Sequence, residues 1–179
     1  MGTKNFSVVV AIFLISFISG CDPAYQFCDD MATSARVPDI FTLGPLQETY
    51  NRGDVVILRG SIANISPYFA EPNVNLLEVT GVDTAWLSVG ATELFDGNTV
   101  HYINGSKRDG AANWYNMPYS QTGDVYEFEV KITLDRIGVY RFYASYAIQI
   151  IGQECNKYVI DTNIAGANVE GMIEFEVIE

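Results

Sequence analysis

The chain has 179 residues, and its 22 acidic and 10 basic side chains give it a formal net charge of −12 at neutral pH. This acidic balance argues against binding to nucleic acid and against adsorption to an anionic membrane surface, because both carry negative charge. The length is ordinary for a single domain with a hydrophobic core. His101 is the only histidine, and one histidine with a few separated cysteines is too small a ligand set for a zinc site.

The N-terminus has the pattern of a secretory signal. Lys4 is the only charged residue of Met1–Gly20, and an apolar run of 13 residues extends from Phe6 to Ile18. A short basic start, an apolar run of this length and small residues after it are typical of a signal peptide. The run is shorter than the roughly 20 residues that a membrane-spanning helix needs. We therefore expect residues 1–20 to be cleaved as a signal, and a permanent membrane helix is the less favoured alternative.

The signal ends in Ile18-Ser19-Gly20-Cys21, which resembles the lipobox of bacterial lipoproteins. The resemblance implies that diacylglycerol is attached to the Cys21 sulfur and that the chain is cleaved after Gly20. Two or more acyl chains anchor a protein stably, whereas a single chain is marginal. The alternative is an ordinary cleaved signal that happens to precede a cysteine. A lipoprotein would belong to the Gram-negative envelope, on the periplasmic or the surface face, and we favour the outer over the inner membrane.

Residues 21–38 show no hydrophobic period and are predicted to form the lipidated N-terminus and a tether. From residue 39 to residue 179 we expect one β-domain. In its clearest strand, Tyr126 to Leu134, apolar and polar residues alternate over nine positions, as in a strand with one buried face. About eight short strands separated by Gly, Asn, Asp and Pro favour an all-β antiparallel sandwich. In chain order they are predicted over 40–43, 54–62, 74–80, 85–89, 99–103, 126–134, 138–150 and 171–179.

Between the predicted strands, residues 104–123 form a stretch of 20 residues without a strand pattern. A loop of this length in a compact domain tends to be functional or disordered. Trp114, Tyr115 and Tyr119 stand there among Asn, Ser and Gly, a composition that resembles an antibody paratope. Tyr68 lies in a second aromatic loop, after the second predicted strand. These four residues are the candidate binding loop, and the alternative is that Trp114 and Tyr115 pack as a plug over one end of the domain.

The run Asp135 to Ala144, DRIGVYRFYA, resembles the corner between strands E and F of immunoglobulin-like domains. The resemblance makes Tyr140 the structural corner tyrosine, whose hydroxyl bonds to the main chain just upstream. The turn Tyr50 to Asp54 is similar to the A–B turn of bacterial immunoglobulin-like and fibronectin type III-like modules. Together they imply an antiparallel immunoglobulin-like β-sandwich. Phe142 stands where antibody domains have a cysteine, so their disulfide between the two sheets is missing.

Cys28 and Cys155 are the two cysteines besides Cys21. An even number of cysteines in an exported protein suggests a disulfide. In an immunoglobulin-like sandwich, Cys28 would precede the first strand and Cys155 would lie in the F–G connection, at the same end of the domain. The resemblance therefore implies a disulfide between them, and two free thiols are the alternative.

The sequence predicts no catalytic residue, no metal site and no cofactor. His101 lies among β-forming residues with no serine or cysteine motif near it, and the glutamate pairs fall on the polar faces of strands. No glycine-rich phosphate loop follows a strand. The favoured hypothesis is a non-catalytic accessory module that docks on an outer-membrane protein assembly. A surface carbohydrate-binding module is the alternative, and an enzyme is third.

Overall fold

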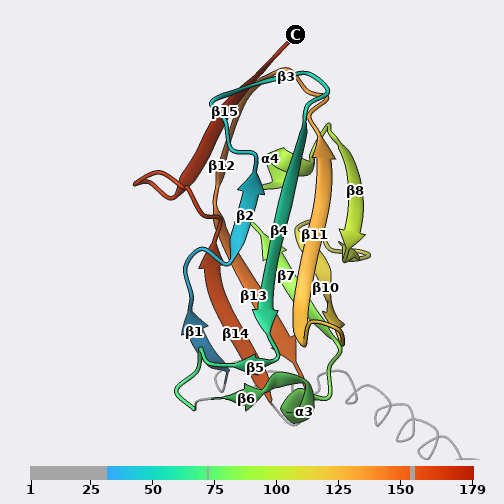
Figure 1. The fold of residues 1–179 in the computed structure, drawn as a ribbon, viewed down its shortest axis with the longest axis vertical. Helices are drawn as coiled ribbons and strands as arrows, with labels where there is room; N and C mark the ends of the chain where they lie inside the picture. Colours follow the sequence, from blue (N-terminus) through green and yellow to red (C-terminus); the bar gives the residue numbers. More distant parts are fainter. Residues whose placement is uncertain (1–31, 72, 154–155) are drawn as a thin grey trace, which may run out of the picture.

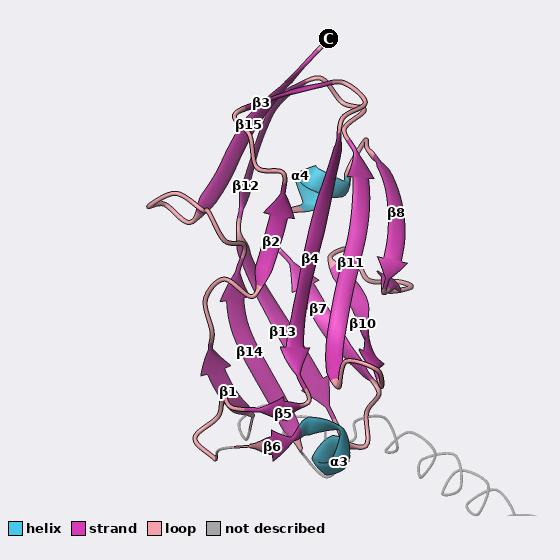
Figure 2. Ribbon diagram, in the orientation of Figure 1, coloured by secondary structure: helices cyan, strands magenta, loops and turns pink. Residues whose placement is uncertain are grey.

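The computed structural model describes residues 32–71, 73–153 and 156–179. The predicted signal peptide, Cys21 and both members of the expected Cys28–Cys155 disulfide lie outside these residues. Strands dominate the described chain (Figure 2), so the predicted all-β class is confirmed. The elements are β1 (Thr33–Arg36), β2 (Phe41–Gly44), β3 (Thr49–Asn51), β4 (Val55–Ala63), β5 (Ile65–Ser66), β6 (Val74–Asn75), α3 (Leu76–Thr80), β7 (Thr84–Val89), α4 (Thr92–Phe95), β8 (Thr99–Asn104), β9 (Ser106–Lys107), β10 (Trp114–Ser120), β11 (Val125–Thr133), β12 (Gly138–Tyr143), β13 (Ser145–Ile151), β14 (Lys157–Asn163) and β15 (Met172–Ile178).

The larger sheet has the strand order β1-β14-β13-β7-β10-β11-β4-β2, with β8 beside β11 and β9 beside β10. It curls strongly, as Figure 1 shows. Phe41 of the edge strand β2 forms a parallel bridge with Ile164, directly after β14, and the main-chain N–H of Ala165 donates to the carbonyl oxygen of Phe41 at 2.8 Å. The two sides of the curled sheet therefore meet, and the side chains on its inner face are enclosed.

A smaller sheet, β12-β15-β3, lies at the end that carries the C-terminus (Figure 1). The predicted strand over 138–150 is divided between the two sheets, since β12 belongs to the small sheet and β13 to the curled one, with Ala144 between them. The apolar residues of one phase stay buried across this division, including Tyr140, Phe142 and Ile148. The amphipathic segment 138–150 therefore contributes buried side chains from both sheets to one hydrophobic core.

The strand pairing is mixed rather than purely antiparallel. β1 runs parallel to β14, and β3 runs parallel to β15. The described residues hold fifteen strands instead of about eight, and several of them have only two to four residues. Strands this short are joined through main-chain hydrogen bonds, which do not require alternating polar and apolar side chains. The hydrophobic pattern of the sequence therefore does not predict them. β1 also carries the sheet into the segment 21–38 that the sequence predicts to be a tether.

The predicted strand over 74–80 is wrong beyond its first two residues, because the chain turns into α3 there. The side chain of Asn75 accepts a hydrogen bond from the main-chain N–H of Glu78 and caps the helix N-terminus. Gly81 ends the helix in the left-handed conformation, with φ of 67°. Caps at both ends outweigh the β-forming side chains between them.

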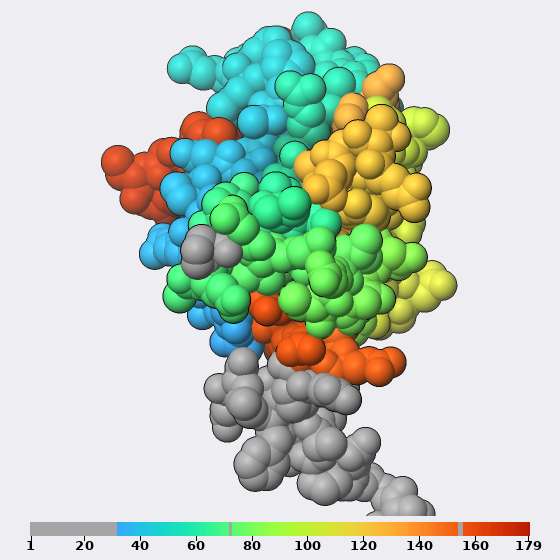
Figure 3. Space-filling view, turned by 60° about the horizontal axis from the view of Figure 1, so that its bottom comes forward, coloured from blue at the N-terminus to red at the C-terminus, as the bar shows by residue number. Residues whose placement is uncertain are grey.

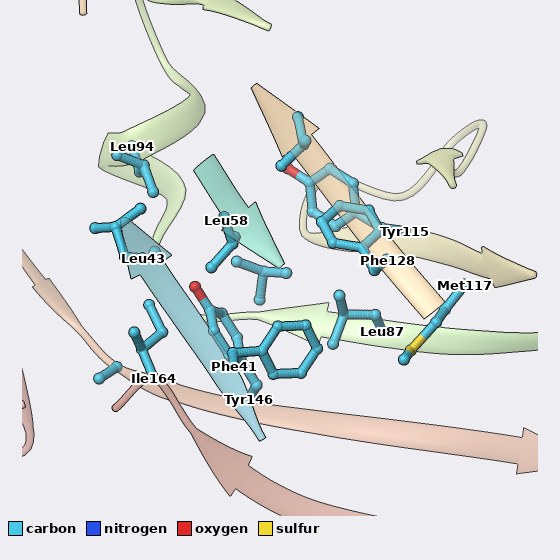
Figure 4. Packing of buried hydrophobic residues seen from close by; sticks show 14 of the residues in the cluster. Phe41, Leu43, Leu58, Leu87, Leu94, Tyr115, Met117, Phe128, Tyr146 and Ile164 are labelled. Atoms are coloured by element: carbon cyan, nitrogen blue, oxygen red, sulfur yellow. The ribbon is translucent and has the colours of Figure 1, made fainter. Parts of the chain in front are cut away.

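The core fills the inside of the curled sheet and the space under the small sheet. Figure 4 shows Phe41, Tyr146, Leu58 and Leu87 packed from different strands. The rings of Phe41 and Tyr146 meet edge to face, with centroids 5.0 Å apart. Gly60 leaves room for Phe41, because a Cβ there would lie 2.5 Å from that ring. The inward positions of β11, namely Tyr126, Phe128, Val130 and Ile132, are buried with the adjoining Leu134, as the alternation predicts.

Candidate functional site

The predicted 20-residue loop over 104–123 is wrong as secondary structure. Trp114–Ser120 forms β10, which pairs with β7 and β11, and Ser106–Lys107 forms β9 beside it. A turn over 108–113 joins the two strands. A strand was indicated here by the alternation of outward and buried residues over 114–117. Pro118 argued against a strand, because proline is rare inside strands.

The predicted binding residues do not gather in one loop. Tyr115 is 2% exposed and packs against Phe95 and Phe128, with ring centroids 4.9 and 5.6 Å apart, so it belongs to the core. Burial raises its pKa well above the usual range of a tyrosine. The Tyr119 hydroxyl donates to the Asp124 carboxylate at 2.7 Å, and this hydrogen bond is the main cause that raises the Tyr119 pKa. Both residues therefore have structural partners.

Tyr68 belongs to the segment between β5 and β6. This segment lies at the end of the domain that carries α3 (Figures 1 and 3). It is partly buried against the core, and its main-chain N–H donates to the Ser66 hydroxyl at 3.4 Å. Trp114 starts β10 and pairs with Ser88 near the far end of β7 from α3. The structure therefore separates Tyr68 from Trp114 along the sheet.

Trp114 instead has a second tryptophan beside it on the outer face of the curled sheet. Trp86, in β7, points outward in the phase opposite to the buried Ala85 and Leu87. The two indole ring centroids are 6.5 Å apart, and the ring planes are inclined at 82°. Both residues are partly buried by their neighbours and keep a smaller part of their surface open to solvent. The sequence already indicated that Trp86 faces outward, because it alternates in phase with the polar residues Thr84 and Ser88.

Polar side chains border the two rings. Strand register places Asn116, Trp86 and Gln149 in one row across β10, β7 and β13. The Asn116 side-chain amide donates to the Ser106 hydroxyl at 2.9 Å. Arg108, in the turn after β9, reaches across β10 so that its guanidinium carbon lies 3.5 Å from the centroid of the Trp86 ring. We call this surface the tryptophan face; it consists of Trp86, Arg108, Trp114, Asn116 and Gln149.

The turn itself holds Arg108 in place. Its main-chain N–H donates to the Trp114 carbonyl oxygen at 2.9 Å, and its carbonyl oxygen accepts from Ala111 at 3.4 Å. A guanidinium over an indole ring is attracted by the ring's negative face. No sequence signal pointed to this contact, because Arg108 and Trp86 are 22 positions apart in the chain and β10 lies between them in the sheet.

Tyr140 makes a local hydrogen bond to the main chain just upstream of it. Its hydroxyl lies 2.9 Å from the carbonyl oxygen of Arg136, four residues upstream, and 2.8 Å from Oδ1 of Asn98. The side chain is fully buried and stacks on Phe175, with centroids 4.8 Å apart. The ring therefore fastens the start of β12 to the residues that precede it.

Tyr140→Phe is expected to lower the free energy of unfolding by about 1–2 kcal/mol, because it removes the hydroxyl hydrogen bond that joins β12 to the residues before it. Tyr143→Phe, in the opposite phase of β12 and 62% exposed, should change it by less than about 0.5 kcal/mol. Among the described residues, the buried Tyr146 hydroxyl has no hydrogen-bond partner, so Tyr146→Phe should raise the free energy of unfolding by about 1 kcal/mol. Urea melts of the three variants measure these differences, and equal losses at positions 140 and 143 would contradict the assignment of faces.

His101 is exposed in β8, opposite Lys131 of β11. Within the described part of the chain, no three His, Cys, Asp or Glu side chains are placed to hold a metal ion. Neither α3 nor α4, the helices of residues 32–71, 73–153 and 156–179, is long or apolar enough to cross a membrane. Comparison with protein-family models and with curated protein sequences found no match to this chain.

Proposed function

We propose that this protein is a non-catalytic accessory lipoprotein of the bacterial envelope that docks on a membrane protein assembly through its tryptophan face. The observation that carries the proposal is the cluster of Trp86, Trp114 and Arg108 on an outer sheet face. Tryptophan and arginine are the residue types most enriched among the side chains that dominate binding energy in protein interfaces. They combine a large apolar area with donors that fix orientation.

The geometry of the rings favours a protein partner over a glycan. Sugar rings stack on open faces of aromatic side chains. A glycan chain binds best where several aromatic rings of the protein lie in one plane. Here the two indole planes are inclined at 82°, and the guanidinium of Arg108 covers one face of Trp86. A carbohydrate-binding module stays the second candidate, because the amides of Asn116 and Gln149 beside Trp114 are suitable partners for sugar hydroxyls.

The lipid anchor supports docking within the envelope. In this proposal Cys21 carries the acyl chains, and β1 begins at Thr33. Twelve residue steps separate the two, and a fully extended chain of that length spans at most about 40 Å. The domain would stay within that reach of the bilayer, which favours a neighbouring membrane protein as its partner. We favour the outer membrane.

We also propose that the domain is a divergent immunoglobulin-like sandwich. The hydrogen bond from Tyr140 to the main chain at Arg136 supports this relationship. The curled sheet and the parallel strands β1 and β3 mark the divergence from the antiparallel arrangement.

Site-specific photo-crosslinking in the intact envelope tests the docking proposal. A benzoylphenylalanine at position 88, between Trp114 and Ala147 in the strand register, should give one discrete protein adduct. The same group at exposed position 176, on the small sheet, is the matched control and should give none. Trp114→Ala should reduce the adduct at position 88 by about tenfold, the effect of losing a hot-spot side chain.

Equal labelling from positions 88 and 176, or no adduct at position 88, would contradict docking through this face. Affinity electrophoresis in gels that contain envelope polysaccharides tests the second candidate. Retardation of the protein that Trp114→Ala abolishes would favour the carbohydrate-binding module.

A further inference from the structure

We infer that Arg108, stacked on Trp86, is the receptor for a carboxylate side chain of the docking partner, so that the tryptophan face recognises an acidic protein segment. The inference rests on the proposed docking function and adds the chemistry of the partner. It follows from the state of the Arg108 charge, from the geometry of its guanidinium and from the charges on the surrounding sheet.

The charge of Arg108 has no acidic partner among the described residues. The ion pairs there join Arg141 to Glu170 and to Glu174, and Arg108 makes its side-chain contact with the Trp86 ring instead. This occurs in a chain with 22 acidic side chains, and Asp109 is the next residue. The protein thus holds a cation on an aromatic ring while leaving its charge uncompensated.

Stacking leaves the part of the guanidinium that binds carboxylates free. A distance of 3.5 Å from the guanidinium carbon to the Trp86 ring centroid is a van der Waals contact distance, which favours a guanidinium lying flat on the ring. The N–H groups of a guanidinium lie in its own plane and then point outward. Two of these N–H groups match the two oxygens of a carboxylate and bind them in parallel. Because the ring fixes the plane in advance, less side-chain freedom is lost when the carboxylate binds. The ring centroid of Trp114 lies 6.5 Å from that of Trp86. Trp114 therefore adds apolar surface beside the ring on which Arg108 lies.

The surrounding sheet matches an acidic ligand. The outward positions of β7, β10 and β13 hold no acidic residue; they are Thr84, Trp86, Ser88, Trp114, Asn116, Pro118, Ser120, Ser145, Ala147, Gln149 and Ile151. The nearest outward acid on the next strand, Asp161 of β14, stands opposite Arg36 in the register with β1. The adjoining strand β11 carries Glu127 and Glu129, of which Glu129 stands opposite Arg59 of β4 in the register. Arg108 is thus a cation on a part of the sheet whose outward positions carry no acid, which favours an acidic segment as its ligand and orients that segment through Arg108.

The experiment measures the adduct from the photo-crosslinker at position 88 in the full-length, membrane-anchored protein, with charge variants at two neighbouring cations. Arg108→Glu should lower the adduct yield by about tenfold or more, because attraction to the carboxylate becomes repulsion. Arg108→Lys keeps the charge but loses the planar fork, and should lower the yield by a smaller factor of about three to ten. Lys107→Glu makes the same charge change one residue away and should change the yield by less than about twofold. Thermal melts of each variant confirm that the fold is retained.

Mass spectrometry of the adduct then identifies the contacting peptide of the partner. We expect an Asp or Glu in that peptide whose replacement by Arg restores the adduct with Arg108→Glu. An undiminished adduct with Arg108→Glu overturns the inference but leaves docking intact. Equal losses at positions 107 and 108 also overturn it, since they show a general charge effect. No adduct from the unaltered Arg108 protein means that the docking proposal itself has failed.

Discussion

Gly105→Ala is expected to lower the free energy of unfolding by about 3 kcal/mol or more. Gly105 joins β8 to β9 with φ of +98°, a conformation that strains any residue with a side chain. An added Cβ would also lie 2.5 Å from the carbonyl oxygen of Asn116 and 2.7 Å from the Phe128 ring. The first neighbour is main chain in a paired strand and the second is a core ring, so neither can move away without cost. Urea denaturation, with the slope compared between variants, measures the loss.

Gly110→Ala is the matched control, because Gly110 also has positive φ, at +73°, but has no atom within 4 Å of the added Cβ. It isolates the backbone strain, and we expect a cost of about 1 kcal/mol. Equal losses at the two positions would show that the contacts of Gly105 with Asn116 and Phe128 are not limiting. Gly105→Ala should also reduce the crosslink at position 88, because it displaces the hairpin that carries Arg108 and Trp114.

Asn98→Ala is expected to lower the free energy of unfolding by about 3 kcal/mol, because its side chain bonds to three main-chain groups at about 1 kcal/mol each and shares the single Tyr140 hydroxyl proton with Arg136. Its Oδ1 accepts from the main-chain N–H groups of Asp135 and Arg136 at 2.9 and 3.2 Å, and it lies 2.8 Å from the Tyr140 hydroxyl. Its amide N–H donates to the Leu94 carbonyl oxygen at 3.0 Å. Asn98 thus ties the end of α4 to the corner before β12. Thermal and urea melts measure the loss.

Two variants serve as controls for Asn98→Ala. Asn116→Ala removes an exposed hydrogen bond to Ser106 and should cost less than about 1 kcal/mol. The double variant Asn98→Ala with Tyr140→Phe should cost less than the sum of the single changes, because both remove the same hydrogen bond. Strict additivity would show that the Tyr140 hydroxyl bonds to Arg136 alone.

The amino-acid sequence was enough to predict the all-β class and the buried faces of the strands over 126–134, 138–150 and 171–179. Alternation over 126–134 and 172–178 reports which side chains avoid water, and burial of a strand face leaves that record in the sequence. The motif around Tyr140 likewise predicted a local hydrogen bond, because its donor and its acceptor at Arg136 are only four residues apart.

Tertiary structure alone decided which strands pair and where the tryptophan face forms. The parallel strands β1 and β3 are held by main-chain hydrogen bonds, which do not depend on the side chains. Their short sequences, TSAR and TYN, therefore show no hydrophobic alternation that would predict a strand. Trp86 alternates with buried residues in its strand, and Trp114 was expected in a loop. The contact between them depends on the register between β7 and β10. The position of Arg108 over Trp86 depends in turn on a hairpin that lays one side chain across an intervening strand. Pairing across the sheet is set by the closure of the whole core, and no local stretch of sequence records it.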